Sequence, residues 1–190
     1  MTIAPEELYT LGNVALLQLP KTAFFCSRNY PSAIRRDTYL WALEQRTCHQ
    51  CIVSGFHSEL EQTVFRYLLR GNHHPVIHVL GRGIQPSLWL EYEQEIKASR
   101  LLFVSPFEAG VYSVTQETAN IRNLLVADLA DTFFVPYMSS EGNLDHLLKK
   151  EVTSQKNLAT LDVPENAALQ YQNAYVYQPP VLMGGHRHHL

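Results

Sequence analysis

The sequence has little cysteine, no excess of positive charge and no long apolar run. Cys26, Cys48 and Cys51 are too few and too clustered for a disulfide framework. The net charge of -3 supplies no overall positive field for coating nucleic acid or membranes, but it allows a local basic pocket. No apolar run approaches the roughly 18 residues that span a bilayer. Residues 1–15 also lack the basic start of a signal peptide, so we expect a cytoplasmic protein with no membrane partner.

The length and composition predict one globular domain. The chain has 190 residues, of which 46% are apolar and 17% charged, which is enough for a self-sufficient core. We expect this domain over residues 8–163. Residues 164–190 contain prolines, a glycine pair and alternating tyrosines, and we expect them to form an edge-strand extension and a flexible tail.

Short apolar segments alternate with segments that have helical spacing. The pattern predicts strands at Val14–Leu19, Thr22–Phe25, Cys51–Val53, Val76–Leu80, Leu101–Val104 and Thr132–Val135. It predicts helices at Ala33–Glu44, Ser58–Leu69, Pro86–Lys97, Thr118–Leu129 and Leu144–Lys150. Ser58 and Glu61 have the spacing of a capping box at a helix start. Such alternation is typical of an α/β fold with a mostly parallel sheet between two helical layers.

The strand at Thr22–Phe25 leads directly into Cys26, Ser27 and Arg28, just before a helix. Ligands of such folds bind at the carboxyl ends of the strands, where backbone N–H groups and a nearby cation favour an anion. Ser27 and Arg28 are therefore candidates for holding phosphate. The alternative is a helix-capping serine and a surface arginine.

Further candidates lie in other loops at this edge or at a helix start. Arg122 and Asn123 could grip phosphate and orient a base, or they could join loops in a structural network. Glycines allow close backbone approach to a ligand. The remaining candidates in this group are Ser54, Gly55, His57, Gly81, Arg82 and Gly83.

Glu61 could receive a ribose hydroxyl or act as a general base, or it could serve only as the acid of the capping box. Cys48 and Cys51 have the spacing of half a zinc site, but no second pair of cysteines follows them. We therefore predict no metal and no cofactor.

The order of these motifs resembles the Rossmann-like core of the DprA/Smf family of DNA-processing proteins. Residues 26–28 stand where the family has Gly-Ser-Arg, and residues 52–55 stand where it has a strand ending in Ser-Gly. Residues 79–83 match its Val-Leu-Gly-x-Gly turn, and residues 122–124 match its Arg-Asn-Arg helix start. Residues 141–144 resemble its closing Ser-Gly-Ser-Leu and add Gly142 to the candidates. The resemblance covers roughly Leu8 to Leu148.

The chain also departs from the family pattern. The family segment Leu-Ala-Arg-Gly-Ile-Asp is replaced by Phe56 to Glu61, with loss of an arginine and a glycine. Leu124 replaces another family arginine, and Cys26 replaces a glycine. The pocket has therefore lost part of the charge that the family implies.

The resemblance implies a Rossmann-like domain, single-stranded DNA binding and pairing into a homodimer. Because some family cations are missing, we predict that the chain binds a nucleotide or another phosphorylated small molecule. One alternative is a module that binds single-stranded DNA. A second is a nucleotide N-glycosidase or hydrolase that uses Glu61. We expect a binding protein more than an enzyme.

Overall fold

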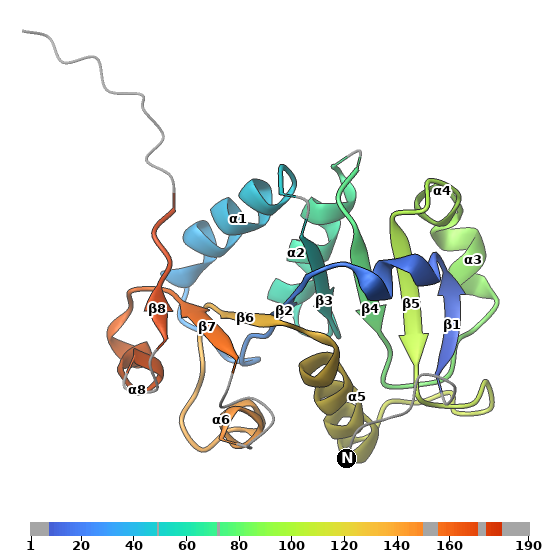
Figure 1. The fold of residues 1–190 in the computed structure, drawn as a ribbon. Coiled ribbons are helices and arrows are strands. Elements are labelled where there is room, and N and C mark those ends of the chain that lie inside the picture. The colour runs from blue at the N-terminus through green and yellow to red at the C-terminus, as the bar shows by residue number, and fades with distance from the viewer. Residues whose placement is uncertain (1–7, 49, 72, 150–155, 171–173, 180–190) are drawn as a thin grey trace, which may run out of the picture.

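A single eight-stranded sheet forms the centre of the molecule, with helices on both faces (Figure 1). The computed structural model describes residues 8–48, 50–71, 73–149, 156–170 and 174–179. The strand order is β1-β5-β4-β3-β2-β6-β7-β8. The strands are β1 (Tyr9–Gly12), β2 (Lys21–Phe24), β3 (Cys51–Ser54), β4 (Val76–Val79), β5 (Leu101–Ser105), β6 (Thr132–Val135), β7 (Asn157–Thr160) and β8 (Tyr175–Val176). β1 runs antiparallel to β5, and the other pairs are parallel. The predicted mostly parallel α/β fold is confirmed.

The helices divide between two core layers. Buried residues of α1 (Ile34–Gln45), α2 (Glu59–Leu69), α3 (Ser87–Glu91) and α4 (Glu93–Lys97) pack on one face of the sheet. Those of η2 (Val14–Gln18), α5 (Gln116–Leu129), α6 (Asn143–Leu148) and α8 (Ala167–Gln170) pack on the other. The short η3 (Pro164–Asn166) leads into α8. Figure 1 shows α1 and α2 above the sheet and α5 and α6 below it.

Successive side chains of the central strand enter opposite core layers, as the period of a strand requires. Ala23 and Phe25 belong to the core layer between the sheet and α5, whereas Phe24 belongs to the core layer between the sheet and α1. The Phe24 ring stacks on Trp41 at 5.3 Å, and Trp41 stacks on Phe134 at 4.2 Å. The central strands are therefore buried on both faces, which explains why their sequences read as continuous apolar runs.

Strands are added to the sheet on both sides of β2. From β2 it proceeds outward through β3, β4 and β5, and it then returns to place β6 and β7 on the other side of β2. The carboxyl ends of β2 and β6 therefore lie at a topological switch point, with helices leaving on opposite faces. In open α/β sheets, ligands bind in the crevice at such a point.

Two predicted elements differ from the structure. Residues 14–19, predicted as a strand, form the 3-10 helix η2, because the Asn13 side chain accepts a hydrogen bond from the backbone N–H of Ala15 and caps a turn there. The helix predicted over residues 86–97 is interrupted at Tyr92, whose φ of -119° and ψ of 26° are not helical, so it divides into α3 and α4.

Two strands were not predicted. β1 is short and mostly exposed, and β7 has only four residues and lies where the apolar pattern of the sequence ends. The predicted end of α6 at Lys150 lies outside the described residues, whereas α6 itself ends at Leu148. Within the described parts of the chain, no helix combines the length and apolar character needed to cross a membrane.

Candidate functional site

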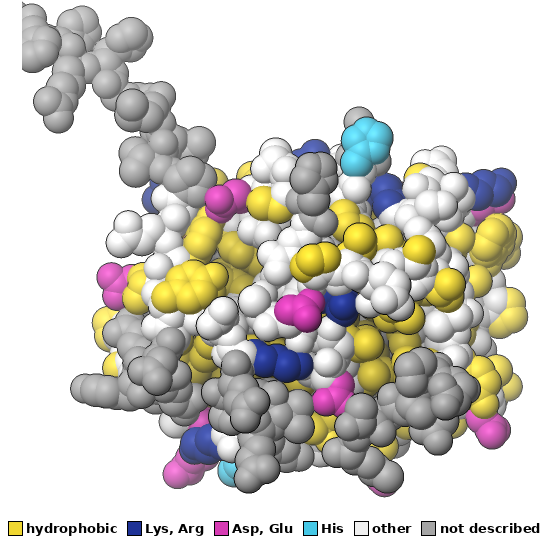
Figure 2. Space-filling model, viewed as in Figure 1, with side chains coloured by type: hydrophobic (Ala, Val, Ile, Leu, Met, Phe, Trp, Pro, Cys, Tyr) yellow, Lys and Arg dark blue, Asp and Glu magenta, His cyan; other side chains and the backbone are white. Residues whose placement is uncertain are grey.

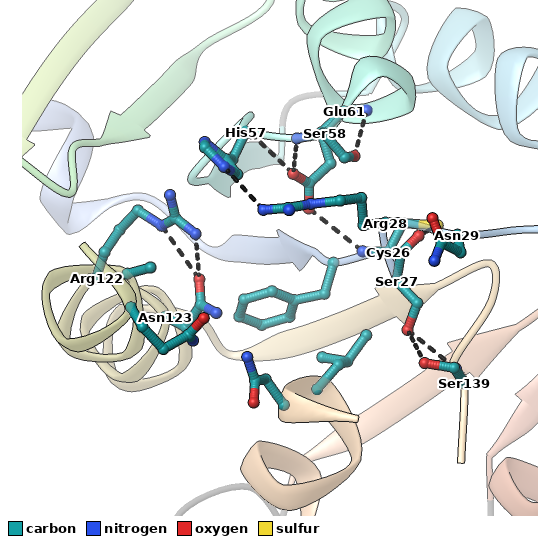
Figure 3. A pocket seen from close by; sticks show the side chains of 15 residues that line it. Cys26, Ser27, Arg28, Asn29, His57, Ser58, Glu61, Arg122, Asn123 and Ser139 are labelled. Atoms are coloured by element: carbon teal, nitrogen blue, oxygen red, sulfur yellow. Dashed lines mark hydrogen bonds between the residues drawn. The ribbon is translucent and has the colours of Figure 1, made fainter. Parts of the chain in front are cut away.

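A pocket of about 380 Å³ lies at the switch point, between the loops that follow β2, β3 and β6 and the start of α5 (Figure 3). We call it the main pocket. It is lined by Phe25, Cys26, Ser27, Arg28, Asn29, His57, Ser58, Glu61, Gln116, Ala119, Arg122, Asn123, Ser139, Asn143 and Leu144. Most of the residues predicted around Arg28 and Arg122 therefore do lie together.

Arg28 is exposed at the pocket and points toward His57 (Figure 3). Its Nη2 lies 3.3 Å from Nε2 of His57. Because a guanidinium only donates hydrogen bonds, Nε2 of His57 accepts this one, and the ring proton lies on Nδ1. Burial lowers the pKa of His57, and the positive charges of Arg122 and Arg28 lower it further. The imidazole is therefore neutral at pH 7.

Arg122 projects from α5 into the same pocket and is only 6% exposed. Its Nε and Nη2 donate to Oδ1 of Asn123 at 3.1 and 3.0 Å. Burial lowers the pKa of the guanidinium, and the nearby Glu61 carboxylate counteracts this effect. Among the described residues, neither Arg122 nor Arg28 forms an ion pair. Two guanidinium groups without a carboxylate partner thus face one cavity.

The Glu61 carboxylate is buried in the pocket wall and accepts three backbone hydrogen bonds. Its Oε1 accepts from the N–H of Cys26 at 3.3 Å. Its Oε2 accepts from the N–H groups of His57 and Ser58 at 2.8 and 2.9 Å. The Ser58 hydroxyl accepts in turn from the N–H of Glu61, which confirms the predicted capping box.

Ser27 joins the loop after β2 to the loop after β6. Its hydroxyl oxygen accepts from the N–H of Ser139 at 2.9 Å and from the Ser139 hydroxyl at 3.2 Å. Its own N–H donates to the carbonyl of Tyr137. Ser27 therefore holds two pocket loops together and retains one hydroxyl proton to donate.

Several predicted residues lie away from the main pocket. The Ser54 hydroxyl is fully buried, donates to the carbonyl of Phe24 at 2.7 Å and accepts from the N–H of Phe56. Gly83 packs its Cα against the carbonyl of Glu108, where a Cβ could not fit. Gly142 is the N-cap of α6. Structural contacts are therefore sufficient to explain why these three residue types stand at these positions.

Cys26 lines the main pocket as predicted, but its side chain is only 9% exposed. Burial, followed by the nearby Glu61 carboxylate, raises the pKa of its thiol far above the usual range. The thiol is therefore neutral, and Cys26 adds no charge to the site.

Among the hollows that share residues with the main pocket, two contain arginines. The first, which we call the Arg82 pocket, has a volume of about 270 Å³, includes Gly55, Gly81 and Arg82, and shares His57 and Arg122 with the main pocket. The second, the Arg35 pocket, includes Tyr30, Ser32, Arg35 and Glu59, and shares Arg28 and Asn29 with the main pocket. The three hollows are therefore adjacent along the carboxyl edge.

Charges of both signs lie near one another on the face shown in Figure 2, and they form no large basic patch there. The sequence reasoning missed Gln116, Ser139 and Asn143 in the main pocket. Gln116 and Asn143 are the first residues of α5 and α6, and Ser139 lies in the loop between β6 and α6. Their positions at helix starts and at this sheet edge were signals that could have identified them.

The topology and the pocket define a class: a Rossmann-like domain with a small, arginine-containing pocket at its switch point. The chain belongs to the DNA recombination-mediator protein A family, whose family model matches residues 1–166. This confirms the resemblance to the DprA/Smf family. A comparison with curated protein sequences finds no match.

Several solved structures have a similar fold. DNA processing protein A from Helicobacter pylori, which has a single-stranded DNA binding mode, is 23% identical, with a TM-score of 0.72 over 93% of this chain and 84% of that chain. DNA processing protein A from Streptococcus pneumoniae is 17% identical, with a TM-score of 0.73. This chain is covered over 90% of its length, but it spans only 62% of the Streptococcus chain.

The fold also resembles that of the molybdenum cofactor binding protein from Rippkaea orientalis. That protein is 12% identical, with a TM-score of 0.55 over 85% of this chain and 91% of that one. At this level of identity, the likeness concerns the fold alone.

Proposed function

We propose that this protein binds single-stranded DNA along the carboxyl edge of its sheet. The observation that carries the proposal is the continuity of the three hollows, which places Arg82, Arg122, Arg28 and Arg35 along one track. Family membership and the single-stranded DNA binding mode of the Helicobacter relative support it. The prediction that the chain binds a nucleotide has less support, because a single nucleotide would use only one of the hollows.

Backbone phosphates are the expected ligands of Arg28 and Arg122. A guanidinium presents several donors in one plane and forms charge-assisted bonds with phosphate oxygens. Within the described part of the chain, Nη1 of Arg122 has no hydrogen-bond partner, and the Arg28 guanidinium bonds only to a neutral imidazole. Both can therefore accept a phosphate without first breaking an ion pair.

The Arg35 pocket offers a stacking surface at one end of the track. The Arg35 guanidinium lies 5.5 Å from the centre of the Tyr30 ring, and both residues line the hollow. Bases of single-stranded DNA stack on aromatic rings and on guanidinium planes without sequence preference. Tyr30 and Arg35 are thus expected to hold a base next to the phosphate at Arg28.

The salt dependence of oligo-dT binding tests the proposal. Single-stranded DNA loses affinity with a log–log slope of about -0.7 per phosphate contact. If three or four phosphates lie on the track, fluorescence anisotropy should give a slope of about -2 to -3. Arg28→Ala should weaken binding about tenfold or more. Arg66→Ala is the matched control, because Arg66 is exposed on α2 and lines none of the three hollows.

A second candidate function is binding of a nucleotide or another phosphorylated small molecule in the main pocket. The volume of about 380 Å³ favours it, because this lies within the range of small-molecule sites. A thermal-shift panel of mononucleotides, cyclic nucleotides and oligo-dT would separate the candidates. Stabilisation by one nucleotide, together with failure of oligo-dT to bind, would replace our proposal with this one.

Three finer expectations from the sequence remain predictions. A hydrolase or N-glycosidase that uses Glu61 requires turnover that Glu61→Gln abolishes. A homodimer would join two tracks into a longer groove, and light scattering of the purified protein measures its mass. The cytoplasm remains the expected compartment, which fractionation of cells would test.

A further inference from the structure

We propose that Glu61 makes the main pocket select phosphodiesters, which carry one negative charge, over phosphomonoesters, which carry close to two. The inference rests on the proposed function, because it names which phosphate of a nucleic acid the pocket accepts. It assigns Glu61 a role in specificity in addition to its role in the capping box.

Backbone N–H groups at the wall of the main pocket already donate to a carboxylate. In nucleotide-binding α/β folds, N–H groups at the start of a helix receive the phosphate. Here the N–H groups of Cys26, His57 and Ser58, from the loops after β2 and β3, converge on the Glu61 carboxylate. This carboxylate is only 8% exposed and lines the pocket. A negative charge of the protein itself thus occupies the position that a phosphate would otherwise take.

The main pocket has a small net positive charge. Its titratable lining residues are Cys26, Arg28, His57, Glu61 and Arg122. The Cys26 thiol and the His57 ring are neutral at pH 7, because burial raises the pKa of the first and lowers that of the second. Two guanidinium groups and one carboxylate remain. The pocket therefore carries a formal charge of about +1.

This net charge of the main pocket matches a phosphodiester better than a phosphomonoester. A phosphodiester neutralises a pocket of charge +1, whereas a phosphomonoester carries about -1.5 to -2 at pH 7 and leaves an excess of negative charge. This excess faces the Glu61 carboxylate in a partly enclosed site, where charges interact more strongly than in water. The interior of a DNA strand contains only diesters, whereas free mononucleotides carry monoesters. Glu61 would thereby favour the strand over free nucleotides.

Thymidine 5′-monophosphate and its methyl ester test the inference, because they differ in charge and by one methyl group. Each is titrated as a competitor against labelled oligo-dT at pH 7.5. The wild-type protein should bind the methyl ester more tightly. Glu61→Gln removes the charge at nearly constant size, and it should shift the affinity ratio toward the monophosphate by about tenfold or more.

Two further variants separate charge from the stability of helix α2. Glu61→Asp keeps the negative charge and should retain the wild-type preference for the methyl ester. Val64→Ala removes buried apolar atoms from the same helix, outside the three hollows and without changing the charge, so it should lower the melting temperature and leave the ratio unchanged. A ratio that follows the melting temperature across these variants would show a purely structural role and overturn the inference.

The wild-type protein supplies a second measurement if Glu61→Gln does not fold. Below about pH 6 the monophosphate becomes a monoanion. Its affinity relative to the methyl ester should then rise, because the two compounds now carry the same charge. A ratio that is independent of pH, a wild-type preference for the monophosphate, or failure of both compounds to compete would overturn the inference. Failure of oligo-dT itself to bind would instead overturn the proposed function.

Discussion

Arg122 occupies its buried position because residue 55 has no side chain. A Cβ built on Gly55 would lie 2.5 Å from Nε of Arg122, which is too close for any real contact. The guanidinium therefore crosses the backbone of the loop after β3 on its way into the pocket. The sequence suggested Gly55 as a position where a ligand approaches the backbone. In the structure, the Arg122 side chain makes this close approach.

Gly55→Ala should displace Arg122 and weaken oligo-dT binding about as much as Arg122→Ala does, about tenfold. The displaced atoms belong to a flexible side chain, so stability should change by less than about 1 kcal/mol. Anisotropy measures the first effect and urea unfolding the second. Gly110→Ala is the matched control, because a Cβ there meets no atom within 4 Å. Unchanged affinity in Gly55→Ala would contradict this role of the glycine.

His78 is expected to make stability depend on pH. Its ring packs against Phe56, Phe65 and Phe103, and Nε2 donates to the carbonyl of Gly55 at 3.1 Å. Burial lowers the pKa of His78 from 6.5 to about 3. Below pH 6.5 the unfolded chain therefore binds more protons than the folded one, and the free energy of unfolding falls as the pH falls.

The size of this effect is up to about 1.4 kcal/mol per pH unit between pH 6.5 and the folded pKa. Urea unfolding at intervals from pH 7 to pH 4 measures it. His78→Phe keeps an aromatic ring in the cage and should make the dependence shallower by about one proton. An identical pH dependence in both proteins would show that His78 does not protonate on unfolding.

At the scale of elements, local signals account for what the sequence predicted well. The central strands are buried on both faces and read as apolar runs, and α2 begins with a complete capping box. The interrupted α3–α4 segment could not be foreseen, because the break at Tyr92 concerns backbone angles within a pattern of helical period. Segment η2 differs for a similar reason, since a side chain at Asn13 sets its first turn.

For the candidate site too, local sequence patterns predicted some features and not others. The order of the loops predicted that Arg28 and Arg122 share one sheet edge, and the pocket contains both. Ser54 ends β3 at the same sheet edge, yet its hydroxyl donates to the neighbouring strand β2. The bond from Ser27 to Ser139 joins residues 112 positions apart, and no local pattern encodes it. Contacts between distant loops are therefore the part of the site that the sequence does not reveal.

Asn166 connects several elements behind the pocket. Its Nδ2 donates to the carbonyl of Pro136 at 2.8 Å and to the Thr160 hydroxyl at 2.9 Å, and its Oδ1 accepts from the N–H of Met138. It is fully buried. It thus supports the start of the loop that carries Ser139 into the main pocket.

Asn166→Ala should lower the free energy of unfolding by about 2–4 kcal/mol, because buried backbone groups lose their partners. Urea unfolding measures the loss. Asn120→Ala, on the exposed side of α5, should change stability by no more than about 0.5 kcal/mol. Equal effects of the two substitutions would mean that the network around Asn166 is replaced by water at little cost.

At the scale of the whole molecule, we propose that residues 8–163 form the domain and residues 164–190 extend it. The extension contributes contacts to the sheet: β8 pairs with β7, and the Tyr177 ring packs edge-on against Phe134 while its hydroxyl donates to Glu44. These contacts lie at the edge of the sheet opposite to β1.

A chain that ends after Val163 should still unfold in one cooperative transition, at a lower urea concentration than the full chain. It loses Asn166, β8 and the packing of Tyr177, but it keeps the paired strands β1 to β7. Circular dichroism during urea unfolding measures the transition. Absence of any cooperative transition would show that the extension belongs to the domain itself.

The switch point also determines when the pocket can exist during folding. Pairings among β3, β4 and β5 join segments that follow one another in the chain, whereas Thr22 of β2 pairs with Thr132 of β6, 110 positions away. Closing so long a loop costs more entropy, and pairings of this kind form slowly. Because the main pocket lies between β2 and β6, a nascent chain has no site until α5 and β6 have emerged. The first half of the chain therefore contains only part of the pocket lining, and the complete pocket forms late in synthesis.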